Sequence, residues 1–219
     1  NYLNPDGSQR TWNRTAWDDP TPMYTDNPYW SAYKNYQSDQ RDRLFGNTGI
    51  NVVLLPWLKF TGRAGIDFYT LRMQERMAIG SQAQSYYQED IRTVSERNLE
   101  SFFTIAKRFA NDHLGMNAIL GANRMDRMTE RSGGLTSGGL VIPELFTLQN
   151  SLNAATIFDN TTKKRINSLY ANVSFDYNYM LYLDATIRND HSSTLAGDNR
   201  SYLYPSVSMS FILSELEAL

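Results

Sequence analysis

The sequence has no cysteine, which excludes disulfide bonds and thiolate metal sites. It has two histidines, His113 and His191, expected in a short turn and an outer loop, so we expect no catalytic residue and no enzyme activity. No run approaches the roughly 18 to 20 apolar residues of a spanning helix, so any membrane crossing must use strands. The 21 basic and 23 acidic side chains almost cancel, and this balance argues against a nucleic-acid partner.

The start of the chain lacks an initiator methionine, a basic segment and an apolar segment of the kind found in secretion signals. It reads Asn1-Tyr2-Leu3-Asn4-Pro5. We therefore expect a processed chain or an excerpt of a longer one, and the odd strand number given below favours the excerpt.

What the sequence does contain is a series of alternating apolar and polar segments joined by connections of two very different lengths. Short connections are expected at 55–57, 111–114 and 178–179, and long ones at about 80–90, 132–163 and 190–201. Short periplasmic turns and long outer loops alternate in this way in outer-membrane β-barrels. A soluble antiparallel sandwich also has half-buried alternating strands, but its loops have no reason to alternate in length.

The alternation predicts an all-β fold, the wall of an antiparallel transmembrane barrel with about seven strands between residues 40 and 213. Residues 1–39 are rich in proline and polar residues and are expected to form an extracellular loop. Residues 214–219 are expected to begin a periplasmic turn. Because bacterial single-chain barrels have an even number of strands, seven strands indicate part of a larger barrel.

The cleanest pattern is a hairpin over 169–188, in which each strand has one apolar and one polar face. An earlier strand alternates from Phe60 to Phe68 and continues on the same face with Thr70, Arg72 and Gln74, so it is expected to outrun the bilayer. The charged side chains of the polar faces are expected to point into the lumen and to pair there: Arg63, Asp67, Asp176, Asp184 and Arg188.

The first loop holds a dense group of aromatic side chains, which favours a binding surface for a sugar, a peptide or a partner protein. The alternative is that these rings pack the loop against its neighbours. The candidates are Trp12, Trp17, Tyr29, Trp30 and Tyr33.

Two further motifs do not predict a binding site. The glycine-rich stretch 132–139 lacks the lysine and the following helix of a phosphate-binding loop, so a flexible outer loop is expected. Asp18, Asp19 and Asp159 offer oxygen ligands for calcium, but no calcium-loop spacing accompanies them. We therefore assign no metal site and no cofactor, and calcium in the loops stays an open alternative without a motif.

Four stretches resemble the SusC/RagA family of TonB-dependent transporters: 26–30 with 41–47, 57–67, 168–193 and 199–208. The most specific is 168–190, SLYANVSFDYNYMLYLDATIRND, followed by Ser192-Ser193. The chain departs from the family pattern in its last strand, where Phe211 replaces the usual tryptophan.

The resemblance implies a barrel of about 22 strands in the outer membrane of a Gram-negative bacterium of the Bacteroidota, plugged by an N-terminal domain. Neither the plug domain nor the TonB box is among these residues. The implied partners are a SusD-like surface lipoprotein that acts as a lid, TonB-ExbB-ExbD acting through the missing N-terminal part, and outer-membrane lipid. The implied activity is active import of an oligosaccharide or a peptide, and plug residues would be further partners for the lumen-facing charges.

Two other functions fit the strand pattern. One is a passive outer-membrane channel or an adhesin-like barrel, which would have no plug domain upstream. The other is a soluble sugar-binding β-sandwich, which would be soluble without detergent and would not migrate differently on a gel after heating.

Overall fold

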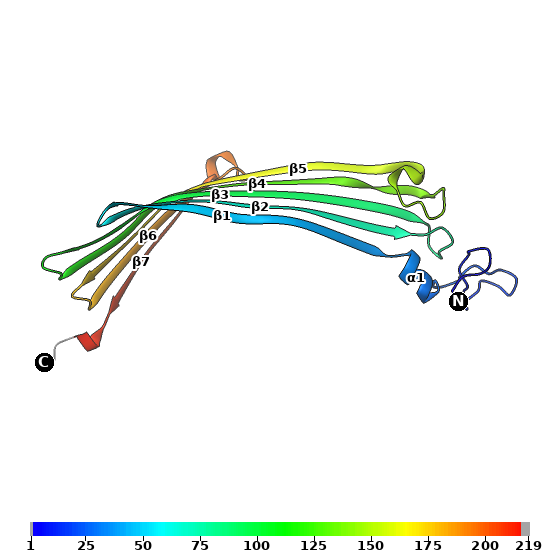
Figure 1. Cartoon of the computed structure of the whole chain (residues 1–219), viewed down its shortest axis with the longest axis horizontal. Coiled ribbons are helices and arrows are strands. Elements are labelled where there is room, and N and C mark those ends of the chain that lie inside the picture. Colours follow the sequence, from blue (N-terminus) through cyan, green and yellow to red (C-terminus); the bar gives the residue numbers. More distant parts are fainter. Residues whose placement is uncertain (1, 216–219) are drawn as a thin grey trace. The chain divides into compact units, whose positions relative to one another are not determined.

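The computed structural model describes residues 2–215. Seven strands between Gln37 and Phe211 form one antiparallel sheet in chain order (Figure 1). This confirms the predicted number and direction of the strands. No helix among the described residues has the length and apolar composition needed to cross a membrane. The strands are β1 (Gln37–Leu55), β2 (Leu58–Met77), β3 (Tyr86–Phe109), β4 (Leu114–Leu140), β5 (Ser151–Tyr177), β6 (Leu181–Ser192) and β7 (Ser201–Phe211).

The predicted short connections are present. Pro56 and Trp57 alone separate β1 from β2. Between β5 and β6, Asn178 and Tyr179 have φ values of 48° and 56°, and the Met180 amide donates to the Tyr177 carbonyl at 3.0 Å. Two successive positive φ values match the twist of the flanking strands, so this turn fixes the register of the hairpin.

The prediction of a long loop over 132–163 is wrong, because β4 continues to Leu140 and β5 begins at Ser151. The glycine-rich stretch lies in β4, where Gly138 and Gly139 have φ values of 77° and 100° that other residues rarely adopt. Glycine at these two positions allows the strand to continue to Leu140 with this backbone conformation. The other long connections are also shorter than expected, at 78–85 and 193–200, and they place His191 in β6 instead of in a loop.

The prediction that 1–39 is only loop is also wrong. A short helix, α1 (Pro28–Lys34), lies within it, and β1 begins at Gln37. The Asn27 side chain accepts a hydrogen bond from the Tyr29 amide, and Pro28 occupies the first turn, where its missing N–H costs nothing. At the other end, a turn of 3-10 helix covers Leu213–Glu215, and the rest of the predicted periplasmic turn, 216–219, lies outside the described residues.

The residues divide into two compact units, each described here by itself. Unit 1 comprises Asn1–Arg43, Tyr69–Val94 and Thr129–Thr162. Its interior contains Trp30, which is 3% exposed and donates its indole N–H to the Ser81 hydroxyl at 2.9 Å. Asn35 bonds the same hydroxyl, and Gln9 donates to the Gly80 carbonyl, so side-chain hydrogen bonds hold residues 2–36 against the β2–β3 connection.

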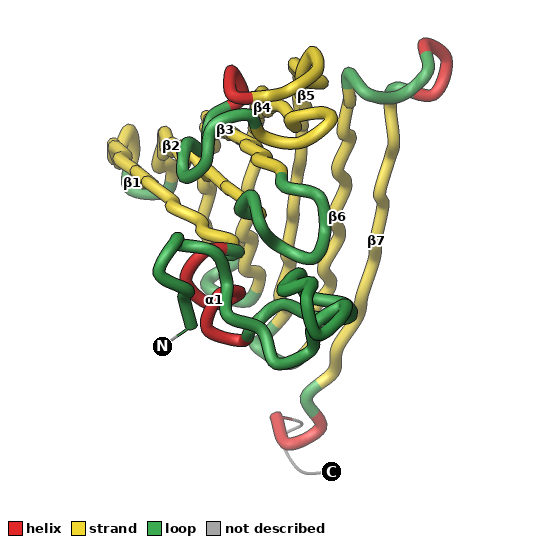
Figure 2. Tube along the Cα trace, turned by 90° about the vertical axis from the view of Figure 1, so that its right-hand side faces the viewer, coloured by secondary structure: helices red, strands yellow, loops and turns green. Residues whose placement is uncertain are grey.

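Unit 2 comprises Leu44–Phe68, Ser95–Met128 and Lys163–Leu219. In it β5, β6 and β7 run side by side (Figure 2). Their register pairs Val173 with Ala185 and Ala185 with Val207, so the apolar positions of the three strands share one face. Val207 is 75% exposed on that face. The apolar positions of β6 are exposed as well: Leu181, Leu183, Ala185 and Ile187.

Within the described residues of unit 2, no second layer covers this apolar face. A soluble sandwich needs such a layer, because its strands bury their apolar face against another sheet. The described sheet therefore gives no support to the sandwich alternative.

Candidate functional site: the polar face of the sheet

The opposite face of β5, β6 and β7 is polar, and the register places three of the predicted site residues on it: Asp176, Asp184 and Arg188. Asp184 lies across from Ser174 and Ser208, and the Ser174 hydroxyl donates to its carboxylate. Arg188 donates to the Ser168 hydroxyl at 3.0 Å and to the Asp190 carboxylate at 2.8 Å.

A hydrogen-bonded network crosses this face of unit 2 at the level of Tyr170. The Tyr170 hydroxyl donates to Glu100 of β3 at 2.8 Å, and Arg63 of β2 forms an ion pair with the same carboxylate at 3.5 Å. Tyr170 lies on β5, so its ring must pass over β4 to reach Glu100. It does so above Gly121, where a Cβ atom would overlap the ring. Asp67 occupies the same face of β2 as Arg63, because side chains alternate along a strand.

An ion pair crosses β4 in the same way. Arg108 of β3 donates two hydrogen bonds to Asp176 of β5, at 3.2 Å and 3.0 Å, and a Cβ atom at Gly115 would overlap the Asp176 carboxylate. Asp176 is buried, and a paired guanidinium offsets the cost of burying its charge. Sequence reasoning missed Glu100, Arg108 and Tyr170. The sequence signal that could have indicated these contacts is the spacing of Gly115 and Gly121, which places both glycines on one face of a strand and leaves room for side chains of neighbouring strands to cross.

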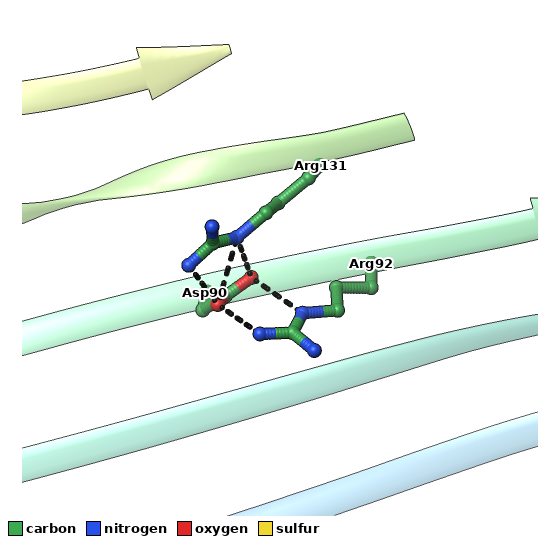
Figure 3. Close-up of polar contacts among 3 residues, drawn as sticks. All are labelled: Asp90, Arg92 and Arg131. Carbon is green, nitrogen blue, oxygen red and sulfur yellow. Dashed lines mark hydrogen bonds and ion pairs between the residues drawn. The ribbon is translucent and has the colours of Figure 1, made fainter. Parts of the chain in front are cut away.

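Unit 1 contains a separate charged cluster around Asp90 of β3. Asp90 is 4% exposed and accepts hydrogen bonds from Arg131 of β4, the shortest at 2.7 Å, and from its strand neighbour Arg92 at 2.9 Å (Figure 3). Burial raises the pKa of the Asp90 carboxyl, but the hydrogen bonds and charges of the two guanidinium groups outweigh it and hold that pKa below its ordinary value. Two arginines share one carboxylate, so the cluster carries a surplus positive charge.

The cluster lines a groove of about 430 Å³ in unit 1. Glu75 lines the same groove and accepts a hydrogen bond from the Tyr86 hydroxyl, and burial together with this bond raises the pKa of Tyr86 to about 12. The groove thus offers acidic, basic and amide side chains together, which suits a polar ligand with charges of both signs. Its other polar lining residues are Gln37, Ser38, Asp39, Gln74 and Gln88. Sequence reasoning did not find it, because its residues lie on different strands.

The structure separates the five aromatic candidates of the first segment. Trp12 and Trp17 are 80% and 88% exposed, and Tyr29 and Tyr33 are also exposed. The Tyr33 ring stacks on Tyr2 with 5.5 Å between centroids. Trp30 is buried, as the packing alternative expected. A binding surface on this segment would therefore use the other four rings.

Residues 2–215 bring together no group of three or more histidine, aspartate or glutamate side chains that could hold a metal ion. Asp19 accepts hydrogen bonds from the Thr21 amide and hydroxyl, so its carboxylate closes a local turn.

No protein-family model and no curated protein matches the sequence. Solved chains of the RagAB peptide importer do match in structure. The chain of its open-open state superposes with a TM-score of 0.78 over 96% of this chain, at 16% identity. The closed-closed state gives 0.74 over 96%, and a further structure of the RagAB peptide transporter gives 0.73 over 90%, both at 16% identity.

These similarities establish a shared fold with part of a transporter chain. Our chain spans only 22% to 24% of the length of those chains.

Proposed function

We propose that this chain is part of the wall of an outer-membrane barrel that actively imports a nutrient. The observation that carries the proposal is the two-faced register of β5, β6 and β7, which leaves a continuous apolar face uncovered beside a hydrogen-bonded polar one. In a transmembrane barrel the apolar face lies against lipid and the polar face lines the lumen.

The exposed apolar face is the main argument for lipid. Monomeric soluble proteins rarely expose contiguous apolar patches larger than a few hundred Å². Here the patch includes Leu169, Val207 and Met209, which are all more than half exposed. Hydrocarbon removes the cost of exposing these groups to water, at about 25 cal/mol for each Å².

The polar face and the unit 1 groove support a polar substrate. We propose a peptide or an oligosaccharide, and the likeness to the RagAB peptide importer makes peptides the first class to test. The groove at Asp90 supports a peptide further, because a peptide carries hydrogen-bonding groups throughout and charged groups of both signs.

The remaining parts of the proposal depend on the resemblance to SusC/RagA transporters. They are a barrel of about 22 strands in the outer membrane of a member of the Bacteroidota, a SusD-like surface lipoprotein as lid, and coupling to TonB-ExbB-ExbD through an N-terminal plug. The exposed rings of Trp12, Trp17, Tyr29 and Tyr33 are the surface we assign to the lipoprotein or the substrate.

The test is uptake by a strain in which the full-length gene is deleted, compared with the same strain carrying the gene. Defined peptides and oligosaccharides are supplied one class at a time, with and without a protonophore. We expect one class to enter only when the gene is present and the proton gradient is intact. Uptake that ignores the protonophore would instead indicate a passive channel, and equal growth of both strains on every substrate would contradict import altogether.

A further inference from the structure

The apolar face of unit 2 has a groove over β2, β3 and β4. This groove has a volume of about 780 Å³ and adjoins a second of about 540 Å³. Thr61 and Arg63 bond to Asn51 and Glu100 on the polar face, so Gly62 and Ala64 face the other way, into the groove.

Small side chains explain the hollow. Gly62, Ala64, Ser101 and Ala122 line the larger groove, and the bulky Phe60 also lines it. Neighbouring small residues on three strands leave a channel in a face that is otherwise covered by large apolar groups. The lining is largely apolar, and its shape suits a flexible hydrocarbon chain.

On the adjacent strands β3 and β4, the row of apolar side chains on this face is followed by an arginine. Along alternate positions, Leu99 is followed by Arg97 on β3, and Ala122 by Arg124 on β4. Arg124 and Arg165 both bond to Asp126, at 2.7 Å and 2.5 Å. Two arginines thus share one carboxylate, and Arg97 lines the smaller groove together with Arg124 and Asp126. The surplus positive charge lies beside the larger groove, because Arg124 lines both grooves.

The height of this basic row matches a membrane boundary. From Leu114, next to the short β3–β4 turn, to Arg124 is roughly ten residues, or about 34 Å of strand at 3.4 Å per residue. A strand tilted by about 45° spans about 24 Å of membrane over that length, close to the ~25 Å apolar band of outer-membrane barrels. The arginines therefore lie where lipid headgroups would begin, on the side away from the short turns.

We propose that this surface is a binding site for an anionic membrane lipid. Its acyl chain occupies the groove, and its phosphate accepts hydrogen bonds from Arg97, Arg124 and Arg165. Guanidinium groups match phosphate oxygens in geometry and charge. The proposal rests on the proposed function, because it requires this face to lie in a bilayer.

The test measures lipid retention by the full-length protein, purified in a non-ionic detergent, with native mass spectrometry. The probes are dioleoyl phosphatidylglycerol and dioleoyl phosphatidylcholine, which share acyl chains and differ in headgroup charge. We expect phosphatidylglycerol to be retained more tightly, and Arg124→Gln to weaken its binding roughly ten- to a hundredfold, because the phosphate loses hydrogen bonds from a charged group.

The matched control is Arg127→Gln, at an exposed arginine of the same strand. Arg127 lies three positions from Arg124 and therefore on the other face. It should leave retention unchanged. Ala122→Phe, which fills the groove, should weaken the binding of both lipids. Equal retention of the two lipids, or equal loss with Arg124→Gln and Arg127→Gln, would overturn the proposal. So would displacement of the lipid by millimolar inorganic phosphate, which would identify a site for free phosphate.

A separate measurement distinguishes this failure from failure of the proposed function. A barrel wall requires detergent for solubility and migrates differently on a gel before and after heating. If the full-length protein is heat-modifiable but shows no headgroup preference, the lipid site alone is wrong. If it is soluble without detergent and not heat-modifiable, the membrane assignment is wrong as well.

Discussion

At the scale of single residues, two glycines of β4 decide which side chains can meet across the sheet. Gly121→Ala would place a methyl group into the Tyr170 ring, so we expect a loss of about 1–3 kcal/mol in unfolding free energy, as for other overpacked sites. The measurement is the denaturation midpoint of the full-length protein in detergent, followed by its heat-modifiable migration.

Gly46→Ala is the matched control, since a Cβ atom at Gly46 of β1 would have nothing within 4 Å. It should leave the midpoint nearly unchanged. The double variant Gly121→Ala with Tyr170→Ala should recover part of the loss, because the overlapping ring is gone. If Gly121→Ala is as stable as Gly46→Ala, Tyr170 does not cross β4 in the way described.

Asp90 gives a prediction about pH. Its pKa is lower in the folded protein than its ordinary value of 3.8, so the ionised carboxylate favours the folded state. That stabilisation is complete above the ordinary pKa and is lost as the pH falls through the lowered one. Asp90→Asn should therefore destabilise the protein at pH 7, by about 1–3 kcal/mol for guanidinium groups left without their partner.

The gap between the wild-type and Asp90→Asn midpoints should begin to narrow as the pH falls toward the ordinary value of 3.8 and should keep narrowing until the pH lies below the lowered pKa of the folded protein. Other carboxylates titrate in both proteins, so their effects cancel in the difference. An equal gap at pH 7 and pH 3 would show that the ion pairs of Figure 3 do not contribute to stability.

At the scale of elements, the alternation of β7 predicts opposite responses at neighbouring positions. Val207 is exposed on the apolar face, and Ser206 lies on the polar face, where its hydroxyl bonds that of Thr186 at 2.5 Å. Arginine near the middle of a bilayer costs about 2–4 kcal/mol on the lipid side of a barrel. We expect Val207→Arg to reduce the amount of folded protein in the outer-membrane fraction, measured by heat-modifiable migration.

Ser206→Arg should fold close to normally, because it points toward water. Equal tolerance of both changes would mean that neither face of β7 touches hydrocarbon. A worse outcome for Ser206→Arg than for Val207→Arg would reverse the assignment of the faces.

The strands also show where the sequence pattern predicted secondary structure correctly and where it did not. The hairpin over 169–188 was predicted correctly because one face is consistently apolar, which makes a period of two visible. Residues 151–163 of β5 were predicted to be loop, because apolar and polar residues do not alternate regularly there. Apolar side chains in this part are exposed, and Ile157 is 64% exposed. Glycines 138 and 139 reinforced that error, since bends inside a long strand and turns between strands use the same residue.

At the scale of the whole molecule, the sequence was sufficient for strand number, direction and faces, and insufficient for the contacts that form the sites. The face of the sheet on which Arg63, Asp176 and Arg188 lie followed from the alternation of apolar and polar residues alone. Their partners did not, because the pairs Arg108–Asp176 and Tyr170–Glu100 depend on the register of three strands at once. Asp90 and Arg131 lie 41 positions apart, and only the pairing of β3 with β4 brings them together.

The first and last strands of the sheet, β1 and β7, have a consequence for handling the protein. Each pairs with a single neighbour, so one side of each carries backbone amides and carbonyls without a strand beside them in the described sheet. Such an edge is a template for adding further strands. If these residues are produced alone, the edge strands of different copies should therefore pair with one another and form insoluble assemblies.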